Sequence, residues 1–342
     1  MVLLTECWTG QWERLLKTKH DKFLALGIDT SAYTTSLAIV DQDENLVIDQ
    51  RKALPVKEGS LGLRQSEAVF AHLNNLPQLL EHCQDKIDHK ALKAIAAATK
   101  PRPVEDSYMP VFKVSEAFGS LMARTMGLFY FNTTHQEGHI MAGLWSAAVP
   151  AGKYLVLHLS GGTTEIISSE EWKAGHLKLK LLAGSSDLNA GQFIDRIGRM
   201  MGLPFPAGPE LEELAKKSAN DHFELPVAVK GRDISFSGPA SQAERMLQKG
   251  CARSELARAV EKCIADSLCQ AVKNLALEND AYDGLITVGG VTANSYIRER
   301  IKNGLPGWMF YNAEPRYASD NAVGIAVQAS RILKEEQLIE KE

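Results

Sequence analysis

The chain has 342 residues, of which 45% are apolar and 23% are charged, so it is long enough for two packed domains and too apolar to be disordered. Its formal net charge of -4 excludes a chain-wide electrostatic grip on nucleic acid, so a nucleic-acid partner must be held by a local patch or by a partner subunit. No apolar stretch approaches the roughly 20 residues of a membrane span. We therefore expect a cytoplasmic protein with no membrane partner.

Residues 1–21 are treated as an N-terminal extension, because they are polar and lack the apolar centre of a signal peptide. Apolar runs at 23–31 and 35–41, joined by small hydroxyl residues, predict a strand, a tight turn and a second strand. A third strand is expected at 45–49. A helix follows at 66–83. Its expected inward residues are Val69, Phe70, Leu73, Leu76 and Leu80.

The next elements alternate between strand and helix. Residues 91–98 read as a buried strand, and a helix is expected to start near Ser115, whose side chain would cap it. Gly127 then allows a turn into a strand at 128–132. The expected inward residues of this second helix are Ala117, Phe118, Leu121, Met122 and Thr125.

The second half of the chain repeats the theme of the first. Residues 154–167 again predict strand, small-residue turn and strand, and a later strand is expected at 284–290. Long helices are expected at 254–278 and 321–336. This recurrence predicts a duplicated α/β unit with a cleft between the halves. We place the first lobe at 22–140 and the second at 141–342, with a helical insertion at about 187–280.

His135 and His139 are spaced four apart, which on a helix places both imidazoles within reach of one metal ion. The pair follows a predicted strand end, where open α/β sheets bind ligands. A zincin-type peptidase is disfavoured, because Gln136 stands where its catalytic glutamate would follow the first histidine.

Two glycine-rich segments suit a nucleotide. The turn at 160–164 exposes backbone N–H groups that suit phosphate oxygens, but no lysine follows as in a P-loop, so ATPase activity is also disfavoured. At 289–294, two glycines let a flat ring approach, and Asn294 can bond a ribose or a base edge. A structural turn and a helix cap explain Asn294 about as well. Asp320 likewise reads either as a helix N-cap or as a third metal ligand.

Together these segments make the chain resemble the TsaD family, the transferases that place a threonylcarbamoyl group on the tRNA adenosine next to the anticodon. The matching segments are 27–31 (GIDTS), 135–139 (HQEGH), 160–162 (SGG), 190–191 (AG) followed by Asp195, 206–209 (PAGP), 236–238 (FSG), 289–294 (GGVTAN) and 319–321 (SDN). The resemblance covers roughly residues 24–332.

The resemblance implies an actin/hexokinase/Hsp70-like (ASKHA) fold, with two lobes and a central nucleotide-binding cleft. It also implies one iron or zinc ion per chain, held by His135, His139 and Asp320. The substrate would be threonylcarbamoyl-AMP or another adenine nucleotide, and other subunits of the pathway would be partners beside tRNA. The substrate contacts carried over are His158, Leu159, Ser160, Gly161, Gly162, Asp195, Gly208 and Asn294.

The chain also departs from the family pattern. Residues 32–35 (AYTT) replace the family's CDET, so two acidic groups are missing, and 99–105 (TKPRPVE) replace a glycine-rich loop. Thr163 stands in place of a histidine. These losses leave a second hypothesis open: a divergent, non-catalytic paralogue that binds metal and nucleotide as a scaffold or regulatory subunit.

Overall fold

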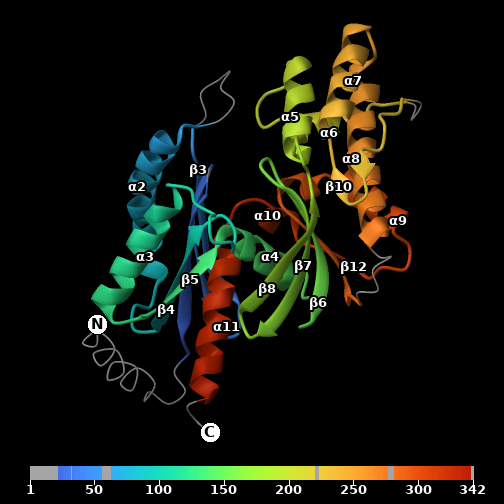
Figure 1. The fold of residues 1–342 in the computed structure, drawn as a ribbon. Coiled ribbons are helices and arrows are strands. Elements are labelled where there is room, and N and C mark those ends of the chain that lie inside the picture. The colour runs from blue at the N-terminus through green and yellow to red at the C-terminus, as the bar shows by residue number, and fades with distance from the viewer. Residues whose placement is uncertain (1–21, 32, 56–62, 220–222, 276–280, 340–342) are drawn as a thin grey trace. The chain divides into compact units, whose positions relative to one another are not determined.

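The computed structural model describes residues 22–31, 33–55, 63–219, 223–275 and 281–339, so the expected N-terminal extension lies outside it. The chain divides into two compact units (Figure 1). The first comprises Met1–Trp145, Trp172–Leu177 and Asp320–Glu342, and the second Ser146–Glu171 and Lys178–Ser319. Within the described ranges, no helix has the length and apolar composition needed to cross a membrane.

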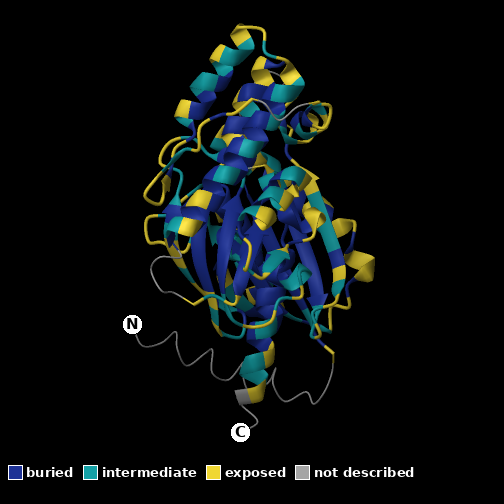
Figure 2. Cartoon of the chain, turned by 90° about the vertical axis from the view of Figure 1, so that its right-hand side faces the viewer, coloured by how far each residue is buried: buried dark blue, intermediate teal, exposed yellow. Residues whose placement is uncertain are grey.

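The first unit is built on a five-stranded sheet. Its strands are β1 (Leu24–Thr30), β2 (Thr34–Asp41), β3 (Leu46–Ala53), β4 (Leu92–Lys100) and β5 (Phe129–Thr134). Their order is β3-β2-β1-β4-β5, with β1, β2 and β3 antiparallel and β4 and β5 parallel to β1. The strands predicted in this half of the chain are therefore confirmed. Most strand residues are buried (Figure 2).

Helices cover both faces of this sheet. They are α2 (Gln65–Glu81), the 3-10 helix η1 (Gln84–Lys86), α3 (Phe112–Met126), α4 (His135–Ser146) and α11 (Val323–Ile339). Leu26 and Ile28 pack in one core with residues of α2 and α3, whereas Gly27 between them faces α11. Because side chains alternate along a strand, α11 lies on the face opposite to α2 and α3.

The inward faces predicted for α2 and α3 were partly wrong. Val69, Leu76 and Leu80 of α2 join the core as expected, but Phe70 is 68% exposed and Leu73 also faces solvent. The inner positions are taken instead by the polar residues His72 and Asn75. Both side chains are hydrogen-bonded, so burying them costs less free energy than burying unpaired polar groups would.

In α3, Phe118 and Met122 pack inward, whereas Ala117, Leu121 and Thr125 are exposed. The helix also begins three residues before Ser115, which caps nothing. The Ser115 hydroxyl lies within its first turn, where it donates to Ala98 O at 2.5 Å and receives the Thr30 hydroxyl at 2.9 Å. Ser115 thus ties α3 to β4 and β1. Gly127 ends the helix in the left-handed conformation, and β5 follows, so the predicted turn into a strand is confirmed.

The second unit repeats the first sheet. Its strands are β6 (Lys153–Leu159), β7 (Thr164–Lys173), β8 (His176–Gly184), β11 (Gly284–Val288) and β12 (Phe310–Asn312), in the order β12-β11-β6-β7-β8. As in the first unit, the leading strand pairs antiparallel with its successor and parallel with a later strand. The predicted duplication of an α/β unit is therefore confirmed.

Several helices of the second unit pack against one long core helix. The helices of this unit are α5 (Ala190–Met200), α6 (Gly208–Ala215), α7 (Ser237–Gln248), α8 (Arg253–Leu275), the 3-10 helix η3 (Gly290–Ala293), α9 (Ser295–Gly304) and α10 (Pro315–Ala318), with two short strands, β9 (Val229–Lys230) and β10 (Asp233–Ile234). Leu256, Val260, Ile264 and Leu268 of α8 are fully buried at helical spacing. The predicted core helix is confirmed as far as Leu275, and its expected end at 278 lies outside the described residues.

Candidate functional site

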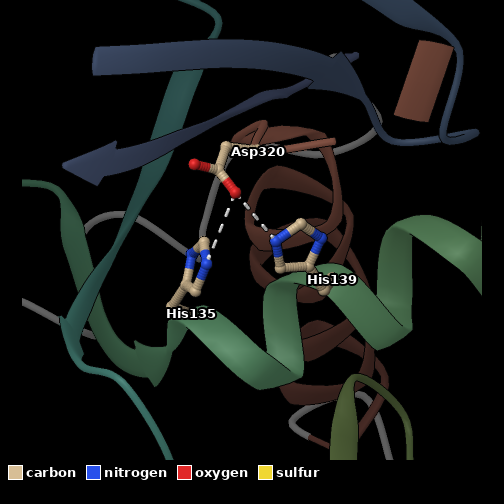
Figure 3. A group of neighbouring side chains, drawn as sticks. All are labelled: His135, His139 and Asp320. Atoms are coloured by element: carbon tan, nitrogen blue, oxygen red, sulfur yellow. Dashed lines mark hydrogen bonds and ion pairs between the residues drawn. The ribbon is translucent and has the colours of Figure 1, made fainter. Parts of the chain in front are cut away.

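His135 and His139 lie on consecutive turns of α4, which starts directly after β5. Their imidazoles both point toward Asp320 (Figure 3). His139 Nε2 is 3.2 Å and His135 Nε2 3.7 Å from the same oxygen, Asp320 Oδ1. The predicted helical placement of the histidine pair is therefore confirmed, and Asp320 is its spatial neighbour within the first unit.

Asp320 lies in the segment that leads into α11. Its second oxygen, Oδ2, accepts a hydrogen bond from the Ser31 hydroxyl at 2.7 Å. The neighbouring Asn321 accepts from the backbone N–H of Val323 at 2.9 Å and so serves the start of α11. Of the two roles left open for Asp320, the capping role falls to Asn321, and the Asp320 carboxylate is directed at the histidines.

Asp29, at the end of β1, fixes the orientation of His135. Asp29 Oδ2 lies 2.6 Å from His135 Nδ1, so the Nδ1–H of His135 donates to the carboxylate and Nε2 faces Asp320. Burial lowers the pKa of His135, but the carboxylates of Asp29 and Asp320 outweigh it and raise this pKa to about 9. Burial opposes ionisation of Asp320, yet the hydrogen bond from His139 and the charge of His135 hold its pKa below the usual range.

Glycines let α4 and α11 approach closely enough for these side chains to meet. A Cβ on Gly324 would overlap the carbonyl oxygen of Gly138, which lies between the two histidines, and would come within 2.5 Å of Ala142 N. A Cβ on Gly138 would lie 2.8 Å from Ile325 Cγ1. The backbones of the two helices are therefore in direct contact, one turn away from Asp320.

The three side chains fit a divalent transition metal. One ligand atom from each of His135, His139 and Asp320 lies within 4.8 Å of the others. Two imidazoles with one carboxylate are a common donor set for such ions and leave coordination positions open for a substrate. Asp29 and Ser31 supply the outer hydrogen bonds that hold ligating histidines and carboxylates in place.

In the second unit, the turn between β6 and β7 is packed against the start of α5. Ser160 N donates to Thr163 O at 2.8 Å and closes the turn, while Gly161 and Gly162 are exposed. Gly191 is required here, because a Cβ would lie 2.6 Å from both Gly161 Cα and Ser160 O. Exposed turn amides beside a helix N-terminus form a site that favours an anion.

The other residues expected to contact substrate lie on β6, α5, α6 and at the start of α9. His158 and Leu159 are buried at the end of β6, and a Cβ on Gly289 would overlap Leu159 O, which joins the 289–294 segment to this strand. Asp195 of α5 accepts from Ala207 N at 2.7 Å, and Gly208 starts α6. Burial raises the pKa of Asp195.

Asn294 is the N-cap of α9, which was one of the two roles predicted for it. Its Oδ1 accepts from Ile297 N at 2.9 Å, and its Nδ2 donates to Glu261 Oε1 at 2.6 Å. Glu261 is fully buried on α8 and pairs with Arg258 at 2.7 Å. Within the described residues, Glu261 is the one protein acceptor of the Asn294 Nδ2 group.

Because the pKa of Glu261 is shifted in the folded protein, we expect the free energy of unfolding to depend on pH. Burial raises its pKa from 4.5 to about 7, although Asn294 and Arg258 act in the opposite direction. The folded protein therefore keeps a proton that the unfolded chain releases, and this stabilisation is lost as the pH rises toward 7. Relative to Glu261→Gln, the wild type should lose on the order of 3 kcal/mol between about pH 4.5 and 7.

Urea denaturation of both proteins across this pH range measures the effect. Glu213→Gln, an exposed change on neighbouring α6, should retain the wild-type profile. Parallel profiles for the wild type and Glu261→Gln would contradict the prediction.

The predicted residues thus fall into two groups, each within one unit. His135, His139 and Asp320 lie in the first unit, and the eight expected substrate contacts lie in the second. Sequence reasoning missed Asp29 as the partner of His135, Ser31 as the partner of Asp320, and Glu261 as the partner of Asn294. The only sequence signal for Glu261 was an acidic residue on the apolar face of a core helix.

The sequence of this chain is similar to those of a known enzyme family. The family model described as tRNA N6-adenosine threonylcarbamoyltransferase, TsaD, matches residues 47–327. A tRNA N6-adenosine threonylcarbamoyltransferase of Archaeoglobus fulgidus is 30% identical over 305 residues, which are 89% of each chain. One of Thermus thermophilus is 30% identical over 312 residues, covering 90% of this chain and 92% of the relative.

Solved structures with the same fold include component A of the (R)-2-hydroxyglutaryl-CoA dehydratase of Acidaminococcus fermentans. Its TM-score is 0.56 at 14% identity, with 91% of this chain and 99% of that chain covered. A ROK family glucokinase of Streptomyces griseus has a TM-score of 0.52 at 12% identity, with 90% and 99% covered. These similarities concern the fold alone, and they confirm the predicted actin/hexokinase/Hsp70-like class.

Proposed function

Because the chain belongs to the TsaD family of tRNA N6-adenosine threonylcarbamoyltransferases, we propose that it transfers a threonylcarbamoyl group to an adenosine of tRNA. The observation that carries the proposal is the family match over most of the chain. In the proposed reaction the N6 amine of the adenosine next to the anticodon attacks the carbamoyl carbon of threonylcarbamoyl-AMP. The bond from that carbon to the phosphate oxygen breaks, N6 loses a proton and AMP leaves.

The second unit provides the residues that would hold the adenylate. The exposed turn residues Gly161 and Gly162, beside the N-terminus of α5, suit the phosphate, and the Gly162 N–H also donates to Ser160 Oγ at 3.3 Å. Asn294 is held rigidly by Ile297 and Glu261, so its remaining amide proton can select a ribose hydroxyl or a base edge. His158 and Leu159 lead into this turn, and Asp195 and Gly208 complete the proposed set of substrate contacts.

The first unit provides the residues that would hold an iron or zinc ion, namely His135, His139 and Asp320. When bound, the ion supplies a Lewis acid for the oxygens of the donor. Asp29 keeps His135 in the tautomer whose Nε2 faces Asp320, and Ser31 fixes the Asp320 carboxylate. We further propose that the protein acts in the cytoplasm, with other subunits of the pathway that supply the donor and help to hold tRNA.

A second candidate function follows from the departures from the family pattern. Residues 32–35 lack the family's two acidic groups, and Thr163 replaces its histidine. A chain with an intact ligand set but altered proton-handling residues would suit a paralogue that binds metal and nucleotide without transferring the group.

The transferase proposal predicts threonylcarbamoyl-adenosine in unmodified tRNA incubated with the purified protein, threonylcarbamoyl-AMP and Fe²⁺ or Zn²⁺. Mass spectrometry of the digested nucleosides measures the product. His89→Ala, an exposed histidine, should retain the activity. If no product forms, alone or with the other pathway subunits, while AMP and the metal still bind, the paralogue hypothesis replaces the transferase.

A further inference from the structure

A chain of buried polar side chains connects α2 to the turn between β1 and β2. His72 of α2 is fully buried, with Nε2 2.7 Å from Ser31 O and Nδ1 2.8 Å from Thr35 Oγ1. Asn75, one helical turn further on, donates from Nδ2 to Thr35 Oγ1 at 3.1 Å. All four residues are less than one tenth exposed, so water does not compete for these hydrogen bonds.

The direction of each hydrogen bond in this chain is determined by its partners. A carbonyl oxygen only accepts, so His72 Nε2 carries the proton that is donated to Ser31 O. Burial lowers the pKa of His72, which favours the neutral ring, so Nδ1 accepts from the Thr35 hydroxyl. The Thr35 oxygen in turn accepts from Asn75, which completes a single consistent arrangement.

This series of hydrogen bonds leads to the proposed metal ligands. Ser31, whose carbonyl is held by His72, donates its hydroxyl to Asp320 Oδ2 at 2.7 Å. The other oxygen of Asp320 faces His139 and His135. Asp29, two residues before Ser31, binds His135. The position of Ser31 therefore affects the orientation of the Asp320 carboxylate.

We propose that His72 is a positioning residue of the metal centre, which fixes Ser31 and thereby the Asp320 carboxylate. This inference rests on the proposed metal site. Packing alone does not account for His72 and Asn75, because apolar side chains would fill the inner face of α2 without the cost of burying polar groups. Their hydrogen bonds instead define where the backbone of the 29–31 segment lies.

Cobalt(II) titration of the metal-free, full-length protein tests the inference, because the visible absorption of Co²⁺ reports both affinity and coordination. His72→Phe should lower the affinity for Co²⁺ about 10- to 100-fold, as expected for loss of an outer partner of a ligand. It should also change the shape of the absorption band. Leu76→Ala removes a buried apolar side chain of α2 without removing any of these hydrogen bonds. It should leave the Co²⁺ affinity and the absorption band unchanged.

A double-mutant cycle separates action through Ser31 from a general loss of stability. If His72 acts through Ser31, His72→Phe combined with Ser31→Ala should bind Co²⁺ no more weakly than the worse single variant. Additive losses would overturn the inference. If His72→Phe does not fold, Thr35→Val serves instead, since it removes the donor to His72 Nδ1 and should still weaken binding several-fold.

The outcomes also distinguish this inference from the proposed function. Wild-type protein that binds no Co²⁺, Fe²⁺ or Zn²⁺ would overturn both the metal site and the role of His72. Wild-type binding with unchanged affinity in His72→Phe and Thr35→Val would overturn the role of His72 alone. Metal binding that depends on His72, in a protein without transferase activity, would support the inference and not the reaction.

Discussion

Gly324→Ala is expected to destabilise the protein by about 3 kcal/mol or more, because the added methyl group has no space at the contact of α11 with α4. Its Cβ would overlap the carbonyl oxygen of Gly138 and lie 2.5 Å from Ala142 N, and both are backbone atoms of a helix that cannot turn aside as a side chain can. The two helices would have to separate. Since α4 carries both histidines and α11 follows Asp320, metal affinity should also fall at least tenfold.

Urea denaturation and metal titration of the Gly324→Ala protein measure these two losses. Gly238→Ala is the matched control, because a Cβ there meets no atom within 4 Å and the residue lies in α7 of the second unit. It should lose much less stability than Gly324→Ala, because the added methyl group meets no backbone atom of another element. A Gly324→Ala protein with wild-type stability would show that the contact can relax.

His139→Ala is expected to reduce metal affinity by more than about 100-fold and to abolish transfer. Loss of an outer partner of a ligand alone costs about 10- to 100-fold, and this change removes a ligand itself. His139 is 3% exposed, so no neighbouring surface group can replace it, and Asp320 loses the hydrogen bond that stabilises its charge. Metal content by elemental analysis and product by mass spectrometry are the measurements.

Asp29→Asn provides an intermediate case, since His135 stays but loses the carboxylate that orients it. Its affinity should fall about 10- to 100-fold, between the wild type and His139→Ala. Exposed His89→Ala should bind as the wild type does. Full metal occupancy in His139→Ala would exclude the proposed ligand set.

The sequence predicted the secondary structure and the helical placement of the histidine pair, because both depend on local residue patterns. The strands of both sheets follow from apolar runs bounded by small residues, and the spacing of His135 and His139 is enough to place both on one side of a helix. A helix cap was one of the two roles predicted for Asn294, and the structure confirms that role. Asp320 was left between two roles, because nothing in the local sequence says which atoms lie opposite its carboxylate.

The sequence did not predict contacts between distant residues. Asp29 meets His135 and Ser31 meets Asp320 only because the sheet and α11 bring together segments far apart in the chain. The inner faces of α2 and α3 were misplaced for a related reason. Apolar periodicity counts hydrophobic residues, whereas His72, Asn75 and Ser115 are buried through hydrogen bonds whose partners lie on β1, β2 and β4 or in the turn that follows β1.

The position of Asp320 so late in the chain has a consequence for biosynthesis. The ribosome makes the strands and the histidine helix of the first unit long before it reaches Asp320 and α11, a delay of ~10–40 s at the usual rates of elongation. Until then the surface of β1, β2 and β4 that α11 covers lacks this helix, and the proposed metal site has only two of its three ligands. A product terminated before Asp320 would therefore lack the third ligand of the proposed metal site.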